Sequence, residues 1–135
     1  MLRPMALDPH ALPDEAQTFV SERRLATLTT VRADGSPHVA PVGFSWDAEA
    51  GLVRIITFAG AHKVEHLSNG AEPRAAVCQV DGGRWLTFEG KATVTDDPER
   101  VAEAVRRYAE RYRQPSERTD RVAIEITVDR VLGRP

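Results

Sequence analysis

Residues 25–46 read LATLTTVRADGSPHVAPVGFSW, and this stretch contains the pattern that decides the fold. Residues 25–31 are rich in Thr, Leu and Val, which favours a β-strand. Asp34 and Gly35 form a pair that tolerates positive φ and predicts a tight hairpin turn, so residues 38–46 are expected to return as a second strand. Pro41 inside that strand indicates a sheet edge, a bulge or a ligand that approaches the backbone.

Outward from this hairpin, the apolar patterns predict four further strands and three helices. The expected strands cover residues 52–58, 74–80, 85–95 and 121–131, and the helices cover 13–24, 61–68 and 98–112. This order has no regular alternation of strand and helix, which argues against a doubly wound parallel sheet. We therefore expect a mainly β protein, a six-stranded antiparallel split β-barrel with three helices.

Length and charge limit the classes of function. The chain has 135 residues and a formal charge of 18 − 20 = −2, which does not suit a general nucleic-acid binder. It has no apolar run long enough to span a membrane and no apolar leader at its start, so we expect a cytoplasmic protein. Residues 1–12 lack periodicity and predict a flexible N-terminal arm before a single domain over residues 13–135.

The last predicted helix has a clear start. Asp97 suits the N-cap position and Pro98 the first helical position. Apolar side chains then recur on one face of the helix, and most of its arginines fall off that face. We interpret Arg106, Arg107 and Arg111 as part of a solvated surface.

Residues 55–63, IITFAGAHK, predict a strand end, a loop of small residues and a helix start. Helix N-termini present unpaired N–H groups and suit phosphate. Lys63 in the first turn opposes the helix dipole, which is easier to explain if an anion lies between them. A solvated lysine is an equally good interpretation of this residue alone.

Residues 62–66, HKVEH, match the H-x-x-E-H pattern of inverted zinc proteases. His62 and His66 would share one helix face, as two zinc ligands do. However, the helix is short, no third ligand is apparent, and such proteases need a far larger scaffold. We therefore interpret both residues as surface histidines and expect no metal.

Residues 79–85, QVDGGRW, are a second stretch of interest. The amide of Gln79 can both donate to and accept from a heterocycle, and Trp85 offers a stacking surface. An ordinary hairpin with a core tryptophan explains the same residues.

Nucleophilic catalysis is not indicated. His38, Glu125 and Cys78 do not form a recognisable triad pattern, and the chain has no G-x-S-x-G elbow. It also lacks G-x-G-x-x-G and P-loop sequences, so nucleotide binding of those types is not supported. With a single cysteine, the chain cannot form an internal disulfide.

Four segments together resemble the flavin and deazaflavin oxidoreductases of the pyridoxamine 5′-phosphate oxidase-like split β-barrel superfamily. They are FVSERRLATLTTVRADGSPHVAPVGF, RIITFAGAHKVEHL, CQVDGGRWLTFEGKATV and RVAIEITVDRVLG, within residues 19–133. The first, third and fourth are especially similar to actinobacterial members that use coenzyme F420. The resemblance implies a homodimer with two cofactor sites at the subunit interface.

The resemblance also implies cofactor-binding residues. Lys63 takes the position of a phosphate-binding lysine, and Thr57 lies at the end of the strand that lines the same site. Pro41 and Val42 correspond to the strand that supplies backbone to the tricyclic ring. Relatives often carry a basic residue at position 61 or 62; this chain has no arginine there, which leaves His62 as a helper of Lys63.

Other implied contacts lie farther along the chain. Gln79 and Trp85 are expected near the cofactor ring or the partner subunit. His38 and Arg84 are candidates for contacts with the substrate, as are arginines of the last helix.

The implied activity is hydride transfer from reduced coenzyme F420 to a conjugated small-molecule acceptor, with a biliverdin-like tetrapyrrole as the first expected acceptor. The cofactor carries the chemistry and the protein supplies placement and electrostatics. No residue is predicted to be an obligatory acid or base. The alternatives are an FMN-dependent oxidase or reductase of the same fold, and a non-catalytic protein that binds a flavin or a tetrapyrrole.

Overall fold

The computed structural model describes residues 5–68 and 73–135. Its strands are β1 (Met5–Leu7), β2 (Ala26–Val31), β3 (Pro37–Val42), β4 (Ser45–Asp47), β5 (Leu52–Phe58), β6 (Arg74–Asp81), β7 (Arg84–Thr95) and β8 (Arg121–Arg134). Its helices are α1 (Asp14–Ser21), α2 (His62–Ser68) and α3 (Pro98–Arg111).

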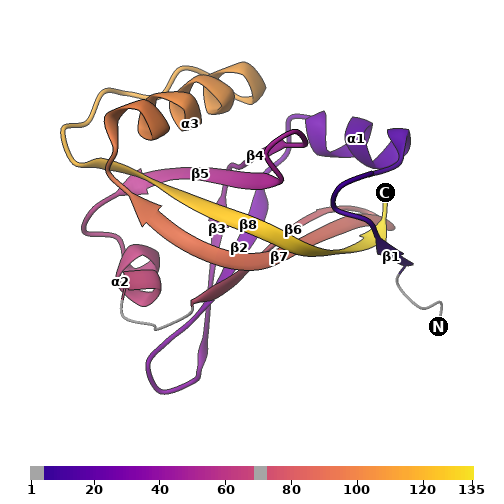
Figure 1. The fold of residues 1–135 in the computed structure, drawn as a ribbon, viewed down its shortest axis with the longest axis horizontal. Coiled ribbons are helices and arrows are strands. Elements are labelled where there is room, and N and C mark those ends of the chain that lie inside the picture. The colour runs from indigo at the N-terminus through magenta and orange to yellow at the C-terminus, as the bar shows by residue number, and fades with distance from the viewer. Residues whose placement is uncertain (1–4, 69–72) are drawn as a thin grey trace.

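The strands form one antiparallel sheet in the order β3-β2-β6-β7-β8-β5-β4, with β1 paired to β8. The two ends of this order, β3 and β4, are separated in the sequence only by Gly43 and Phe44. Because consecutive Cα atoms lie about 3.8 Å apart, the sheet must curl until its two ends meet at this link. The bent sheet, with α3 above β5 and β8, is visible in Figure 1. The split barrel predicted from the sequence is confirmed.

The predicted strand count of six was too low, because the expected strand over residues 38–46 is two strands, β3 and β4, and because β1 was not predicted. The break has a clear cause at Phe44, whose backbone groups bond to side chains in place of a neighbouring strand. Its N–H donates to the hydroxyl of Tyr112 at 3.3 Å, and its carbonyl accepts from Arg111 at 2.5 Å.

The expected loose arm also contains regular structure. Residues Met5–Leu7 form β1 and pair with Val131–Gly133 of β8. Leu12 is buried in the main core cluster. The isolated segment carries no periodic signal, because its partner strand lies at the other end of the chain.

The corner at Gly43 and Phe44 is packed tightly under α3. A Cβ atom placed on Gly43 would lie 2.9 Å from ring carbons of both Tyr108 and Tyr112, closer than side chains pack. The hydroxyl of Tyr112 donates to the carbonyl of Arg24 at 2.6 Å, which ties the corner to the start of β2. The absence of a side chain at Gly43 is therefore what lets α3 lie against the sheet here.

Arg111 is not part of a solvated surface, contrary to the sequence-based interpretation. Its guanidinium donates to the carbonyls of Phe44 and Glu22 and to the side-chain carbonyl of Gln79. It also stacks 4.5 Å above the centroid of the Phe44 ring. Burial lowers the pKa of Arg111 below its usual value. One half-buried cation thus joins α3, the end of α1, the strand corner and β6.

The side chains of β7 alternate between the barrel interior and the opposite face of the sheet. Leu86, Phe88 and Ala92 of β7 are buried, while Thr87 on the opposite face is half-buried. A bulge between Glu89 and Gly90 shifts the register of β7 against β8. At Gly90 a Cβ would collide with the backbone of β8, so this position requires glycine.

The helices begin close to where the sequence places them. Asp97 caps α3 by accepting from the backbone N–H of Arg100 at 3.0 Å, as predicted. Asn69 and Gly70 form a pair that predicts the stop of α2, but both lie outside the described residues. None of the helices in the described part of the chain has the length and apolar character that crossing a bilayer requires.

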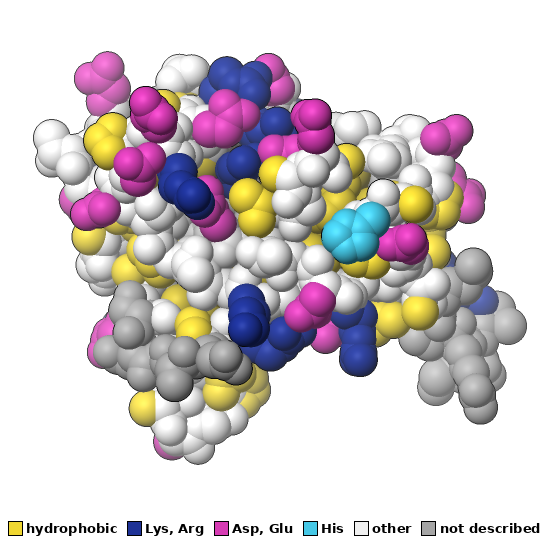
Figure 2. Space-filling model, viewed as in Figure 1, with side chains coloured by type: hydrophobic (Ala, Val, Ile, Leu, Met, Phe, Trp, Pro, Cys, Tyr) yellow, Lys and Arg dark blue, Asp and Glu magenta, His cyan; other side chains and the backbone are white. Residues whose placement is uncertain are grey.

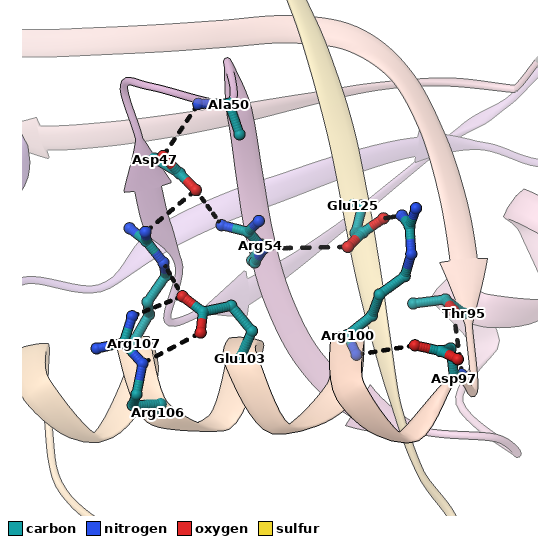
Figure 3. A network of polar contacts seen from close by, with 10 residues as sticks. All are labelled: Asp47, Ala50, Arg54, Thr95, Asp97, Arg100, Glu103, Arg106, Arg107 and Glu125. Carbon is teal, nitrogen blue, oxygen red and sulfur yellow. Dashed lines mark hydrogen bonds and ion pairs between the residues drawn. The ribbon is translucent and has the colours of Figure 1, made fainter.

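Ion pairs hold α3 on the sheet, since Ala104 is its only buried residue. Asp47 of β4 accepts from Arg54 of β5 at 2.7 Å and pairs with Arg107 of α3 at 3.1 Å (Figure 3). Burial raises the pKa of Asp47, but the hydrogen bonds and charges of its partners outweigh burial and leave the pKa below its usual value. Arg107 is therefore also poorly described as solvated.

A second set of contacts anchors the first turns of α3. Arg100 binds the buried carboxylate of Glu125 on β8 at 2.5 Å. Farther along the helix, hydrogen bonds from Arg106 and Arg107 lower the pKa of Glu103 to about 2. Figure 2 shows the outer side of this arrangement, with Lys and Arg interleaved among Asp and Glu over the upper part of the molecule where α3 lies.

We expect Asp47→Asn to lower the free energy of unfolding by about 2–4 kcal/mol, because it leaves the buried Arg54 without its main partner. Urea denaturation followed by tryptophan fluorescence measures this loss. Asp129→Asn is the matched control, since the Arg74–Asp129 pair is half exposed on both sides and is worth less than about 1 kcal/mol.

The cost of Asp47→Asn should also depend on pH. Because the folded pKa lies below the ordinary value, the contribution of Asp47 is present above that ordinary value and is lost as the pH falls through the folded pKa. A difference between wild type and variant that does not shrink in acid would contradict this assignment.

We expect Gly43→Ala to destabilise the fold by about 1–3 kcal/mol, because the new methyl group must displace the rings of Tyr108 and Tyr112. Thermal unfolding measures the effect. The control is Gly83→Ala, where an added Cβ meets nothing within 4 Å and φ is not positive. Equal melting temperatures for both variants would show that the corner is not tightly packed.

Candidate active site

A cleft of about 450 Å³ opens between β3, β5, the first turn of α2 and the segment that leads from α3 to β8. A volume of this size is typical of sites for small molecules and cofactors, about 300–1,000 Å³. The residues that line it are 41–43, 56–58, 63, 108, 113–116, 118 and 121.

The cleft brings together four of the site residues predicted from the sequence: Pro41, Val42, Thr57 and Lys63. Pro41 and Val42 end β3, and Thr57 lies near the end of β5. Lys63 comes from the other side of the β5–α2 turn. Burial lowers the pKa of Lys63, and no carboxylate among the described residues pairs with it. An anion in the cleft would therefore be favoured by this lysine.

Three arginines that line the cleft were not predicted. Arg113, Arg118 and Arg121 line the cleft from the segment between α3 and β8. Arg118 forms two hydrogen bonds with Asp120, at 2.8 and 2.9 Å, and its guanidinium lies 4.4 Å from the centroid of the Phe58 ring. The signal in the sequence was the density of arginine in residues 113–121, RQPSERTDR.

Among the described residues, the charged side chains that line the cleft all carry positive charge. In the described part of the chain, four cationic side chains line it and no Asp, Glu or His does. The flat backbone of β3 and the polar Thr57 complete the wall between the cations. This arrangement can hold a planar ring beside the strand and an anionic group at the cationic walls.

Gln79 was predicted near the cofactor ring or the partner subunit, and the structure places it inside the protein, outside the cleft. Its side chain is fully buried, and its amide donates to the carbonyl of Phe19 at 2.8 Å. Its carbonyl accepts from Arg111 at 2.6 Å. Both polar ends are used inside the protein, so Gln79 joins α1 to α3.

Arg84 and Trp85 begin β7, directly after the β6–β7 turn, and do not line the cleft. Trp85 pairs across the hairpin with Val80 on the outer face of the sheet. Arg84 binds Glu22 and Asp81 and covers the Phe19 ring, and Arg84 with Arg24 lowers the pKa of Glu22 to about 2. The Arg84 side chain is half-exposed and already paired with carboxylates, and its contact with the substrate stays a prediction.

Three of the four histidines, His38, His62 and His66, form a cluster. The ring of His38 on β3 lies edge-on to His66 at 4.8 Å between centroids, and 6.5 Å from His62. His66 shares a hydrogen bond with the buried Thr30 at 3.1 Å, so it is not a simple surface residue. Neither His38 nor His62 lines the cleft. Over residues 5–68 and 73–135, no group of side chains is arranged to hold a metal ion.

Comparison with known proteins bears on the same region. Residues 12–134 match the pyridoxamine 5'-phosphate oxidase family. The F420H(2)-dependent biliverdin reductase of Mycobacterium tuberculosis (strain CDC 1551 / Oshkosh) is 48% identical over 122 residues, which cover 90% of this chain and 88% of that protein.

Two solved structures share the fold. A conserved hypothetical protein from Mycobacterium tuberculosis superposes with a TM-score of 0.76 at 24% identity, covering 92% of this chain and 86% of that one. A structure described as an F420 reductase superposes with a TM-score of 0.71 at 24% identity, covering 89% and 98%. The resemblance inferred from the four sequence segments is confirmed, and the chain belongs to the pyridoxamine 5'-phosphate oxidase family.

Proposed function

We propose that this protein is a reductase that uses reduced coenzyme F420 to reduce biliverdin or a closely related linear tetrapyrrole. The observation that carries the proposal is the cleft that the β3 backbone at Pro41–Val42 and the end of β5 line together with four cationic side chains. The M. tuberculosis relative at 48% identity, named as an F420H(2)-dependent biliverdin reductase, supports the choice of cofactor and acceptor.

The residues of the cleft fit a deazaflavin with a phosphate. Lys63 is partly buried and has no carboxylate partner among the described residues. Burial disfavours its charged form, and a phosphate beside it would compensate that charge. Pro41 and Val42 offer a flat backbone surface for the tricyclic ring, and Thr57 supplies a hydroxyl at the end of β5. We assign Lys63 to the phosphate and the β3 backbone to the ring.

When bound, the reduced cofactor supplies the hydride. The chain's own contribution is to hold the ring against β3, to orient the acceptor on the open side and to keep the charges of both molecules compensated. No carboxylate or imidazole among the described residues lines the cleft. We therefore assign no acid or base to this chain, and the proton comes from solvent or from the substrate.

We also propose that the protein works as a homodimer with the cofactor at the interface. Four of the large exposed apolar side chains, Leu25, Val31, Val39 and Val80, lie on or next to the adjacent strands β3, β2 and β6. An apolar face of this kind suits a second copy of the chain. The exposed Pro41 belongs to β3 and also lines the cleft, so the interface would adjoin the cofactor.

Cofactor titration and anaerobic stopped-flow mixing test the activity. We expect the purified protein to bind F420 more tightly than FMN, and biliverdin to oxidise bound reduced F420. Lys63→Ala should weaken F420 binding about tenfold or more, because it removes a charged contact with the phosphate. Lys91→Ala is the control, since this other lysine of the chain lies on β7 outside the cleft.

Two results would overturn the proposal. Tighter binding of FMN than of F420 would favour the FMN-dependent alternative of the same fold. Binding of both F420 and biliverdin without oxidation of the reduced cofactor would favour a protein that carries these molecules.

We expect Val39→Asp to convert the dimer to a monomer in analytical ultracentrifugation, because it places a charge in the apolar face of the sheet. Ala102→Asp, on the exposed side of α3, is the matched control and should leave the oligomeric state unchanged. A monomeric wild type, or a V39D variant that dimerises like wild type, would exclude this interface.

A further inference from the structure

We propose that Arg113 binds a carboxylate of the acceptor, so that the enzyme selects substrates that carry an acidic side chain such as the propionates of a linear tetrapyrrole. This inference rests on the proposed function and adds a substrate-recognising residue to it. The four cations of the cleft differ in whether they have partners inside the protein.

Two of the three cleft arginines already have partners inside the protein. Arg118 is neutralised by its paired hydrogen bonds with Asp120. Arg121 donates to the carbonyl of Ser116, which fixes the turn before β8. Both are therefore engaged in shaping the wall.

Arg113 differs from the other arginines of this region. Over residues 5–68 and 73–135, no hydrogen bond or ion pair joins its guanidinium to another side chain. By contrast, Arg100, Arg106 and Arg107 of α3 each bind a carboxylate. The cleft thus keeps one arginine whose planar fork is open to a ligand, and a fork of this shape binds a carboxylate through two parallel hydrogen bonds.

The start of the Arg113 side chain is held in place by its neighbour. The ring of Tyr112 packs at Gly43 and its hydroxyl bonds to the carbonyl of Arg24. The backbone of Arg113 therefore leaves α3 beside the strand corner, at the end of the cleft formed by Tyr108 and residues 41–43. A fixed origin of this kind reduces the entropy lost when the arginine orders on a ligand.

Lys63 and Arg113 come from different elements and so define two anionic positions. Lys63 follows β5 and enters from the first turn of α2, whereas Arg113 follows α3. A cofactor phosphate at Lys63 leaves Arg113 for the second molecule, the acceptor. If the cofactor instead contacted both cations, Arg113 would belong to the cofactor site. Measuring F420 binding by an Arg113 variant distinguishes a contact with the cofactor from a contact with the acceptor.

Binding of biliverdin and of biliverdin dimethyl ester to the protein saturated with oxidised F420 tests the inference without turnover. Quenching of tryptophan fluorescence measures both affinities. For wild type we expect biliverdin to bind about tenfold or more tightly than the ester, because the ester cannot accept a charged hydrogen bond pair. Arg113→Gln should reduce biliverdin affinity to that of the ester and leave the ester unchanged.

Three further variants and measurements complete the design. Arg113→Lys should retain an intermediate affinity, since it keeps the charge and loses the fork. Arg106→Gln makes the same change on the exposed side of α3 and should bind both ligands like wild type. In steady-state assays Arg113→Gln should raise KM about tenfold with kcat within about twofold, because the carboxylate is bound equally in ground and transition states.

The outcomes separate this inference from the proposed function. If biliverdin does not oxidise the reduced cofactor, the proposed function fails, while the binding comparison still decides the role of Arg113. If wild type binds acid and ester equally, binds neither, or is matched by Arg113→Gln, the inference is overturned. It is also overturned if Arg113→Gln weakens F420 binding as Lys63→Ala does, since Arg113 would then hold the cofactor.

Discussion

The contact between the end of α3 and the backbone of Phe44 is the interaction on which the rest of the structure depends. Arg111 and Tyr112 satisfy the carbonyl and the N–H of Phe44, so the chain can leave β3 and enter β4 without losing backbone hydrogen bonds. This exchange closes the barrel, because β3 and β4 are the two ends of the sheet. It also buries Phe44 and fixes the two tyrosines over Gly43. The closure of the barrel and the end of the cleft are thus one feature.

The same helix adds buried polar contacts to the half-buried apolar face formed by residues such as Val101, Ala104 and Tyr108. Asp47 and Glu125 are buried on the sheet, and arginines of α3 reach down to them. Removing one partner of a buried pair costs more than the pair itself contributes, because the other charge is left unpaired. Such contacts therefore hold α3 at one defined position on the sheet. That position matters because the segment that follows α3 forms the arginine-bearing wall of the cleft.

The charge of the molecule as a whole conceals the charge of its site. A net charge of −2 describes the whole chain, yet the described lining of the cleft has four cations and no acid. Acidic residues such as Asp47, Glu103 and Glu125 are concentrated under and along α3, where they compensate arginines with structural roles. Lys63 and Arg113, which come from different elements, remain for ligands. Local field, not net charge, suits the cleft to an anionic cofactor and an acidic acceptor.

Local pattern alone determined much of this protein. The alternation in β7, the Asp97 cap and the Asp34–Gly35 turn act over a few residues, so the elements and the antiparallel class were readable, and family segments located Pro41, Val42, Thr57 and Lys63. Tertiary structure decided the break at Gly43, the pairing of β1 with β8, the burial of Gln79 and Arg111, and the entry of Arg113 into the cleft. Each of these depends on a partner far away in the chain, such as Phe44 and Arg111, which lie 67 residues apart. The periodicity of the sequence indicates on which face of its own helix or strand a residue lies. Which distant residues pack against that face is decided only when the sheet curls and α3 packs on it.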